Sequence, residues 1–273
     1  MPPRTSAAVA ALSRVGARTE ETLGYVGGLA ALLGGSFASL AFSGLKPGRS
    51  FDRAIRQAMV VGVSAIPIIS LITFFVGVII ALQGAYGLQR LGATQLVAGL
   101  VAISITRELG PLVAAIVVIG RSGSSFAAEI GAMRVSEELD ALKTMALDPV
   151  AFLVTPKLIA MMLMMPCLTI WSDLMGVLGG ALFGVTGAGF TFGGYFIATR
   201  ESLALRDVTT GLVKSLVFGM VITAVGCYEG FTTGAGAEEV GRSTTSAVVI
   251  SIFLVVLIDL AFTYLFYSAG SGL

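Results

Sequence analysis

Charged side chains interrupt otherwise apolar stretches of this sequence at a few positions. Arg107 and Glu108 stand side by side within residues 95–120, and Asp259 stands well inside residues 247–266. Burying such a group in lipid costs at least about 2.5 kcal/mol, so each should face a partner or a wet cavity. Charges placed in this way either form a transport site or neutralise one another and lock the helices together. For each residue taken alone, both alternatives stay open.

Two more charges fall within apolar stretches. Lys214 stands near the outer end of residues 208–227, where its long side chain could reach water instead of a partner inside the membrane. Asp173 stands in the third stretch, and the sequence assigns it no role.

A proline follows the charges of the second stretch. Pro111 has no N–H group, and its ring crowds the carbonyl of Arg107, so we expect the helix to kink beside Arg107 and Glu108. A kink and two charges at mid-membrane together indicate a functional site, although prolines are common in membrane helices.

The longest polar connection, residues 121–157, contains a second feature that could carry function. Residues 129–145 place apolar side chains at largely three-residue spacings with acidic side chains between them, which predicts a short amphipathic helix ending before Asp148-Pro149. This helix is either a solvated turn or a docking helix whose apolar stripe enters a groove of a cytoplasmic partner. The stripe consists of Ile130, Met133, Leu139, Leu142 and Met145.

Several kinds of chemistry are excluded. The chain has no histidine, which removes His-containing zinc sites and Ser-His or Cys-His nucleophile pairs. No GxxxxGK[ST] phosphate loop is present, so the sequence offers no ATP-binding loop of this kind. We therefore expect a transporter rather than an enzyme, with no metal or cofactor bound by this chain. A net charge of +1 gives no argument for nucleic acid.

The elements that must position these residues are membrane-spanning helices. Of the 273 residues, 56% are hydrophobic and 12% charged, which is too apolar for a soluble domain. We expect an all-α membrane protein with about five spans, each long enough to cross a bilayer core. The spans are residues 58–82, 95–120, 158–188, 208–227 and 247–266.

Residues 22–44 form a weaker sixth candidate, rich in Gly and Ala. Basic residues flank this stretch on both sides, so a crossing would put one cluster on the wrong side of the membrane. We expect residues 1–57 to be an N-terminal cytoplasmic or interfacial segment, and residues 58–273 to be one transmembrane domain. With the N-terminus inside, twelve Lys/Arg fall on the inner side and three on the outer side. The flanking basic residues are Arg4, Arg14 and Arg18 before the stretch, and Lys46, Arg49, Arg53 and Arg56 after it.

Glycines recur every fourth residue in the third span, at Gly176, Gly180 and Gly184. This small-xxx-small spacing predicts close helix packing. The sequence leaves open whether it joins spans of one chain or of two.

Two motifs resemble a known family. Residues 106–149, TRELGPLVAAIVVIGRSGSSFAAEIGAMRVSEELDALKTMALDP, closely resemble the signature region of the MlaE/YrbE family of ABC permeases. Residues 232–249, TTGAGAEEVGRSTTSAVV, resemble the C-terminal motif of that family.

The resemblance implies roles for individual residues. It places Arg107 and Glu108 near a lipid pocket, with Leu88 and Leu91 lining it, and it matches Lys214 and Asp259 to intramembrane charges of the family. It also assigns residues 129–145 to a coupling helix that sits on the ATPase, with Glu129, Met133, Arg134, Glu137, Glu138, Asp140, Leu142 and Met145 as its contact residues.

Assembly and location are implied in the same way. The expected complex is a homodimer with a cytoplasmic ABC ATPase, an MlaD-like MCE-domain protein and a small STAS-like accessory protein. It would move phospholipids or related lipids between the inner and outer membranes. The chain would cross the bacterial inner membrane several times, with its N-terminus cytoplasmic and its C-terminus periplasmic.

Three rival functions remain to be tested. A proton-coupled secondary transporter could use Glu108, Lys214 and Asp259 as a relay. An intramembrane protease would need lysine to activate a serine such as Ser122. A structural scaffold would explain the glycine spacing but not the kinked, charged second span.

Overall fold

The computed structural model describes residues 7–43 and 49–270, without the side chains of residues 7–15, 17–18, 21, 41–43, 49–51 and 269–270. Every regular element in this part of the chain is helical. The first half contains α1 (Ala7–Ser43), α2 (Arg49–Gln89), η1 (Thr94–Leu96), α3 (Val97–Ser104), η2 (Ile105–Leu109), α4 (Gly110–Val118), η3 (Ile119–Gly123) and α5 (Ser124–Val135). The second half contains α6 (Glu138–Thr144), η4 (Val150–Val154), α7 (Thr155–Thr186), α8 (Phe192–Ser202), α9 (Leu205–Thr232) and α10 (Ala237–Gly270).

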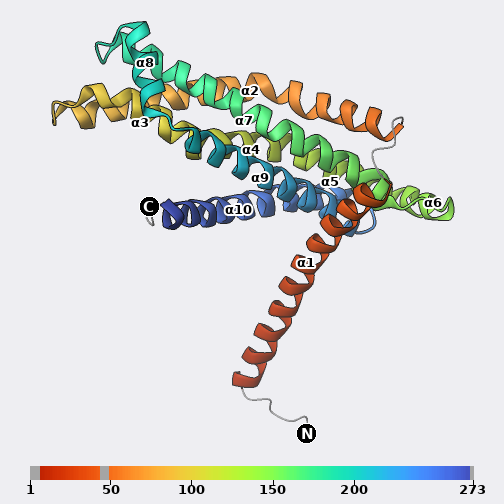
Figure 1. Cartoon of the computed structure of the whole chain (residues 1–273). Helices are drawn as coiled ribbons and strands as arrows, with labels where there is room; N and C mark the ends of the chain where they lie inside the picture. The colour runs from red at the N-terminus through yellow and green to blue at the C-terminus, as the bar shows by residue number, and fades with distance from the viewer. Residues whose placement is uncertain (1–6, 44–48, 271–273) are drawn as a thin grey trace.

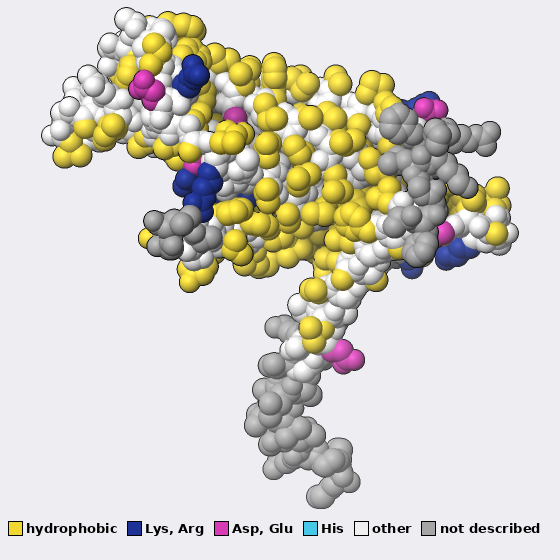
Figure 2. Space-filling view, in the orientation of Figure 1, with side chains coloured by type: hydrophobic (Ala, Val, Ile, Leu, Met, Phe, Trp, Pro, Cys, Tyr) yellow, Lys and Arg dark blue, Asp and Glu magenta, His cyan; other side chains and the backbone are white. Residues whose placement is uncertain are grey.

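Long helices lie side by side in a bundle, with α6 at one end and α8 at the other (Figure 1). Hydrophobic side chains cover the middle of the visible face, while charged side chains gather towards the two ends (Figure 2). Because the lipid interior accepts apolar side chains and disfavours charged ones, this distribution fits a membrane-embedded bundle.

Six helical segments among the described residues are long and apolar enough to cross a membrane. Five of them match the five predicted spans and belong to the bundle, which confirms the all-α fold, although the third of these five ends at Thr186, two residues before the predicted end (Figure 1). The segments are Thr22–Leu40, Asp52–Gln89, Thr94–Val135, Val150–Thr186, Leu205–Thr232 and Ala237–Ser268.

The sixth segment, Thr22–Leu40, is part of α1 and differs from the others in its direction. α1 contacts α9, η4 and α7 near the α6 end, and its N-terminal part projects away from the bundle at a steep angle (Figure 1). α1 thus differs in direction from the five spans of the bundle, and its interfacial position stays a prediction. Of the basic residues that flank it, the side chains of Arg53 and Arg56 are described, whereas Arg4, Lys46 and the side chains of Arg14, Arg18 and Arg49 lie outside the described part.

The expected boundary after residue 57 falls inside a helix. α2 runs unbroken from Arg49 to Gln89, so residues 49–57 continue directly into the first span of the bundle. Arg53 in this part packs its guanidinium 4.2 Å from the ring centre of Phe152, which lies in η4. The start of α2 is therefore held by the bundle.

Glycines allow α2 and α7 to pack closely. A Cβ atom on Gly179 would lie 2.0 Å from the carbonyl oxygen of Phe74, and one on Gly77 would lie 1.9 Å from that of Gly176. Both distances are shorter than any real contact, so only glycine allows this approach of the two backbones.

The glycine series of the third span packs against other helices of the same chain. A Cβ atom on Gly176 would meet the side chain of Ile105 at 2.8 Å. On α8, Tyr195 fills the space beside the other two glycines. A Cβ atom on Gly180 would lie 2.4 Å from the Tyr195 hydroxyl, and one on Gly184 would lie 2.6 Å from the Tyr195 ring. The predicted close packing is confirmed, and within one chain it joins α7 to η2 and α8.

Candidate functional site

The candidate site begins at a π-helical turn in the second span of the bundle. η2 contains Arg107 and Glu108, and the N–H of Gly110 donates to the carbonyl of Ile105, five residues back. Pro111, the next residue, has no N–H to offer to Arg107. The irregularity that we expected as a proline kink is therefore a π-helical turn, a feature that is frequent at functional sites.

Helix α9 approaches this turn at a glycine. A Cβ atom on Gly211 would lie 2.3 Å from the carbonyl oxygen of Thr106. The missing side chain lets α9 lie directly against η2, and the next turn of α9 carries Lys214 past Glu108.

Lys214 forms the centre of a network of charges. Its Nζ atom donates to Glu108 Oε2 at 2.5 Å and to the hydroxyl of Thr263 at 2.8 Å. Asp259 Oδ1 lies 2.9 Å from the same Nζ atom. The Thr263 hydroxyl also lies 3.1 Å from both carboxylate oxygens of Glu108. The structure thus brings together Glu108, Lys214 and Asp259, which the sequence analysis singled out separately.

The burial of this network decides between the two alternatives for Lys214. The Lys214 side chain is 0% exposed, so it lies inside the bundle and does not reach water at the end of its helix. Two carboxylates within 2.9 Å take the place of water as its partners. Burying a charge is costly unless it is paired, so the position of Lys214 depends on both acids.

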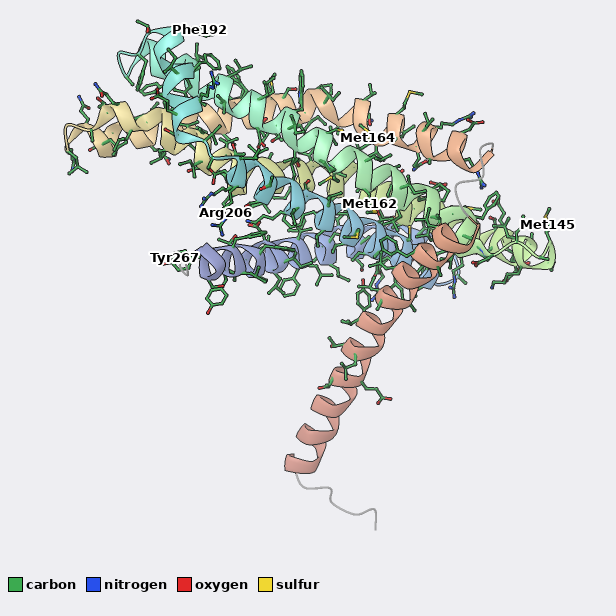
Figure 3. The ribbon with its side chains drawn as sticks, in the orientation of Figure 1. Met145, Met162, Met164, Phe192, Arg206 and Tyr267 are labelled. Carbon is green, nitrogen blue, oxygen red and sulfur yellow. The ribbon has the colours of Figure 1, made fainter. Side chains whose placement is uncertain are left out.

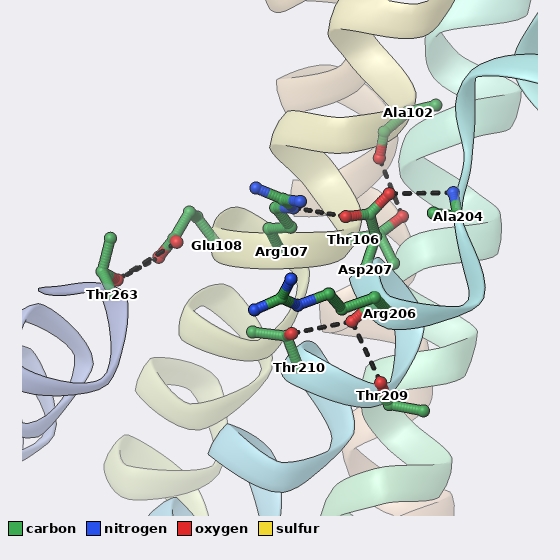
Figure 4. Close-up of polar contacts among 10 residues, drawn as sticks. All are labelled: Ala102, Thr106, Arg107, Glu108, Ala204, Arg206, Asp207, Thr209, Thr210 and Thr263. Carbon is green, nitrogen blue, oxygen red and sulfur yellow. Dashed lines mark hydrogen bonds and ion pairs between the residues drawn. The ribbon is translucent and has the colours of Figure 1, made fainter. Parts of the chain in front are cut away.

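Arg107 has a separate partner, which sequence reasoning missed. Its Nε atom donates to Asp207 Oδ1, and the Asp207 side chain is 3% exposed. The other oxygen of Asp207 accepts from the N–H of Ala204 at 2.9 Å and so caps the start of α9 (Figure 4). An acidic residue in the first turn of a helix was the available signal, because such residues stabilise helix N-termini.

A cavity of about 360 Å³ opens beside these two ion pairs. Figure 4 shows the guanidinium groups of Arg107 and Arg206 one above the other, with Glu108 and Thr263 across from them. Arg206 has no acidic partner among the described residues. Polar and aromatic side chains line this cavity, which we call the arginine pocket: Arg107, Glu108, Arg206, Thr210, Thr263, Phe266 and Tyr267.

The arginine pocket lies away from the α6 end of the bundle. Figure 3 shows Arg206 and Tyr267 near the C-terminal end of α10, and Met145 at the tip of α6. Figure 2 shows basic side chains gathered near the C-terminal end of α10. This location suits a site for the charged end of a ligand at one side of the membrane.

Leu88 and Leu91 do not line the arginine pocket. Leu88 packs against the small cluster that includes Ala85 and Val101, and Leu91 is 77% exposed in the turn after α2. The helix that starts at Thr94 advances about 1.5 Å per residue, so Glu108 lies about 20 Å from this turn. Within one chain, the structure does not bring the two leucines together with Arg107 and Glu108.

The predicted amphipathic helix over residues 129–145 is two helices. α5 ends at Val135 and α6 begins at Glu138, because Glu137 adopts a left-handed backbone with φ 60°. Asp148 acts at the start of the next helix, where its carboxylate accepts from the N–H groups of Val150 and Ala151. The helical segment thus ends before the Asp-Pro pair, as predicted, and the same pair begins the next helix.

The apolar stripe of this segment also faces an unexpected direction. Ile130 and Leu139 are buried in the main hydrophobic core, and Met133 and Leu142 pack against it. These four residues therefore anchor the segment to the bundle, and of the stripe only Met145 stays exposed among the described side chains. Among the expected contact residues, the exposed ones are Glu129, Arg134, Glu137, Glu138, Asp140 and Met145.

Asp173 lies beside the π-helical turn. Its Oδ1 atom is buried, finds no hydrogen-bond partner among the described residues, and occupies the place that a Cβ atom on Gly110 would need. The neighbouring hydroxyl of Ser172 donates to the carbonyl of Gly110 at 3.1 Å. These contacts hold α7 against α4.

Comparison with known proteins gives a consistent picture. The protein-family model described as Permease MlaE matches residues 54–265. A probable ABC transporter permease protein of Rickettsia prowazekii is 42% identical over 232 residues, covering 85% of this chain and 90% of the relative. The intermembrane phospholipid transport system permease protein MlaE of Haemophilus influenzae is 33% identical, covering 81% and 85% of the two chains. The chloroplast protein TRIGALACTOSYLDIACYLGLYCEROL 1 of Arabidopsis thaliana is 36% identical, covering 80% and 63%.

Proposed function

The chain belongs to the MlaE permease family, and on this premise we propose that it carries phospholipids through a membrane as the permease subunit of an ABC transporter. The single observation that carries the proposal is the arginine pocket. It combines two guanidinium groups with the aromatic side chains of Phe266 and Tyr267 at one end of the bundle.

The charges of the arginine pocket suit a lipid phosphate. Asp207 neutralises Arg107, whereas Arg206 has no acidic partner among the described residues. A phosphate between the two guanidinium groups would relieve the repulsion between them and accept several charge-assisted hydrogen bonds. We therefore assign the headgroup phosphate to Arg206 and Arg107, with Glu108 available to pair with a cationic headgroup.

Acyl chains would extend from the pocket along apolar surface. We retain Leu88 and Leu91 as proposed acyl-chain contacts, because Leu91 is exposed and therefore free to touch a lipid. In a homodimer, these two leucines and the arginine pockets of both protomers would line one cavity between the protomers.

We propose that the α6 end faces the cytoplasm and the α8 end the periplasm of a bacterial inner membrane. The distribution of basic residues supports this orientation, since Arg121, Arg134, Lys143, Lys157 and Arg242 all lie in segments towards the α6 end. The N-terminus is then cytoplasmic and the C-terminus periplasmic.

The partners follow from the family. A cytoplasmic ATPase subunit would bind the exposed acidic face of α6, and an MCE-domain protein would receive lipid at the α8 end. A STAS-like accessory protein is a further proposed member of the complex. ATPase closure would push the α6 segments of two protomers together, narrow the cavity and expel the lipid.

A transfer assay tests this function. The permease is purified with its ATPase subunit, reconstituted in liposomes, and assayed for ATP-dependent transfer of a labelled phospholipid. Arg206→Gln should slow transfer about tenfold, because a lost charge-assisted contact is worth roughly 1.5 to 3 kcal/mol. Arg200→Gln, on the exposed surface of α8 and outside the pocket, is the matched control and should transfer normally.

Glu108→Ala provides a second test of the same pocket. Transfer should stall while the complex still assembles. Transfer at the unmodified rate in both Glu108→Ala and Arg206→Gln would contradict the assignment of the pocket.

A proton-coupled transporter is the second candidate function, because Glu108, Lys214 and Asp259 form one connected network. The two functions differ in their energy source. If lipid transfer follows an imposed proton gradient without ATP, the proton-coupled transporter is favoured. Dependence on ATP in the absence of a gradient favours the permease.

A further inference from the structure

An ion pair with one buried partner lies at the base of the segment that carries α6. Lys157 on α7 donates from Nζ to Glu129 Oε2 on α5 at 2.7 Å, and 28 residues separate the two. The Lys157 side chain is 5% exposed, whereas that of Glu129 is 47% exposed. The ammonium group also lies 5.1 Å from the ring centre of Phe126, one turn before Glu129. Lys157 thus holds the same face of α5 through two contacts.

Backbone breaks make α6 a separate piece within this segment. Glu137 before it and Ala146 after it are the only non-glycine residues with positive φ in the described chain, at 60° and 56°. A force applied to α6 could be absorbed by rotation at these two breaks. The ion pair within α6, between Asp140 and Lys143, spans only one helical turn and cannot prevent this.

The pair between Glu129 and Lys157 joins the two arms on either side of these breaks. One arm, α5, continues without interruption through η3 and α4 to η2, which carries Arg107 and Glu108. The other arm is the start of α7, which packs along α2 and α9. Movement of α6 reaches the arginine pocket only if these arms move together.

We propose that the ion pair between Lys157 and Glu129 is a positioning clasp, which transmits movement of α6 to the helix that carries Glu108. The proposal rests on the proposed ATP-driven function. Lys157 and Glu129 contact neither ATP nor lipid, and they act through the placement of α5 and α7.

The test separates ATP hydrolysis from lipid transfer. The permease complexed with its ATPase subunit is reconstituted in liposomes of phosphatidylethanolamine and phosphatidylglycerol, and both rates are measured on one preparation. Lys157→Met keeps an unbranched apolar side chain beside Phe126 but removes the charge. We expect ATP hydrolysis to continue while lipid transferred per ATP falls about fivefold or more, the scale of a typical coupling between two sites. Lys157→Arg keeps the charge and should restore most of the transfer.

Glu129→Gln is the second variant, and it decides the matter if Lys157→Met does not assemble. Glu129 is half-exposed, so its replacement disturbs packing least. The clasp is contradicted if Glu129→Gln transfers as much lipid per ATP as the unmodified protein. It is equally contradicted if hydrolysis and transfer fall in the same proportion, because that result indicates a merely structural role. Absence of ATP-dependent transfer in the unmodified complex would instead overturn the proposed function.

Discussion

Lys214 Nζ lies 2.5 Å from Glu108 Oε2, although 106 residues separate the two in the sequence. Lys214 is completely buried, and its other ionic partner, Asp259, belongs to a third helix. One cation therefore ties η2, α9 and α10 together beside the arginine pocket.

Replacing this cation should destabilise the bundle. Lys214→Met leaves Glu108 and Asp259 close together without a counter-charge, and removal of one partner from a buried pair costs about 3 to 5 kcal/mol. Because Glu108 is partly exposed, the decrease in the free energy of unfolding should lie near the lower end of this range, at about 3 kcal/mol. Unfolding of the purified protein in mixed micelles with increasing SDS measures the change.

The matched variant is Lys214→Met combined with Asp259→Asn. Removing one of the two acids reduces their repulsion, so the double variant should be more stable than Lys214→Met alone. Equal stability of the two variants would mean that Glu108 and Asp259 do not repel each other once Lys214 is replaced.

Asp207 should contribute to the stability of the folded protein in two separable ways. Asp207→Asn loses the ion pair with Arg107 but keeps a side-chain oxygen that can accept from the N–H of Ala204. Asp207→Ala loses both and should be less stable by a further 1 kcal/mol or so, the usual value of a helix cap. Thermal unfolding in detergent compares the two variants, and identical midpoints would argue against the cap.

Close packing of α2 on α7 should fail when a methyl group is added at their contact. Gly179→Ala places Cβ 2.0 Å from the carbonyl oxygen of Phe74, so the helices must separate, at a cost of about 1 to 3 kcal/mol. Gly87→Ala, on the same helix pair but with no atom within 4 Å, is the control and should unfold like the unmodified protein. A similar loss of stability in Gly179→Ala and Gly87→Ala would mean that the change in helix flexibility, and not the contact with Phe74, causes the loss.

The attachment of α1 should depend on one glycine. The ring of Tyr228 fills the space beside Gly28, where a Cβ atom would lie only 2.3 Å from Cε2, and the Tyr25 hydroxyl donates to Glu229 at 2.8 Å. Gly28→Ala should loosen α1 and make it several-fold more sensitive to limited proteolysis, since local unfolding exposes cleavage sites. Gly27→Ala adds the same methyl group where nothing lies within 4 Å. Cleavage at the same rate in both variants would mean that the contact with Tyr228 does not hold α1.

The sequence by itself determined the helical membrane fold, the five spans of the bundle and the residues that carry charge inside them. Hydropathy and helix length are local properties, so a window of about 20 residues is enough to predict a span. The same local reasoning placed Arg107 and Glu108 at an irregular turn, because the effect of Pro111 is felt within one helical turn. The family was predicted from two contiguous motifs, and the comparisons confirm it.

Only the tertiary structure decided which charges are partners and which surfaces are free. Lys214 is buried between two acids instead of reaching water, Asp207 neutralises Arg107, and the apolar side chains around Leu139 pack on their own bundle. Each outcome depends on how helices rotate and cross, which is fixed by close approaches such as Gly211 against Thr106. Contacts between residues about 100 positions apart leave no trace in local periodicity, because the energy that selects them arises only when the helices pack.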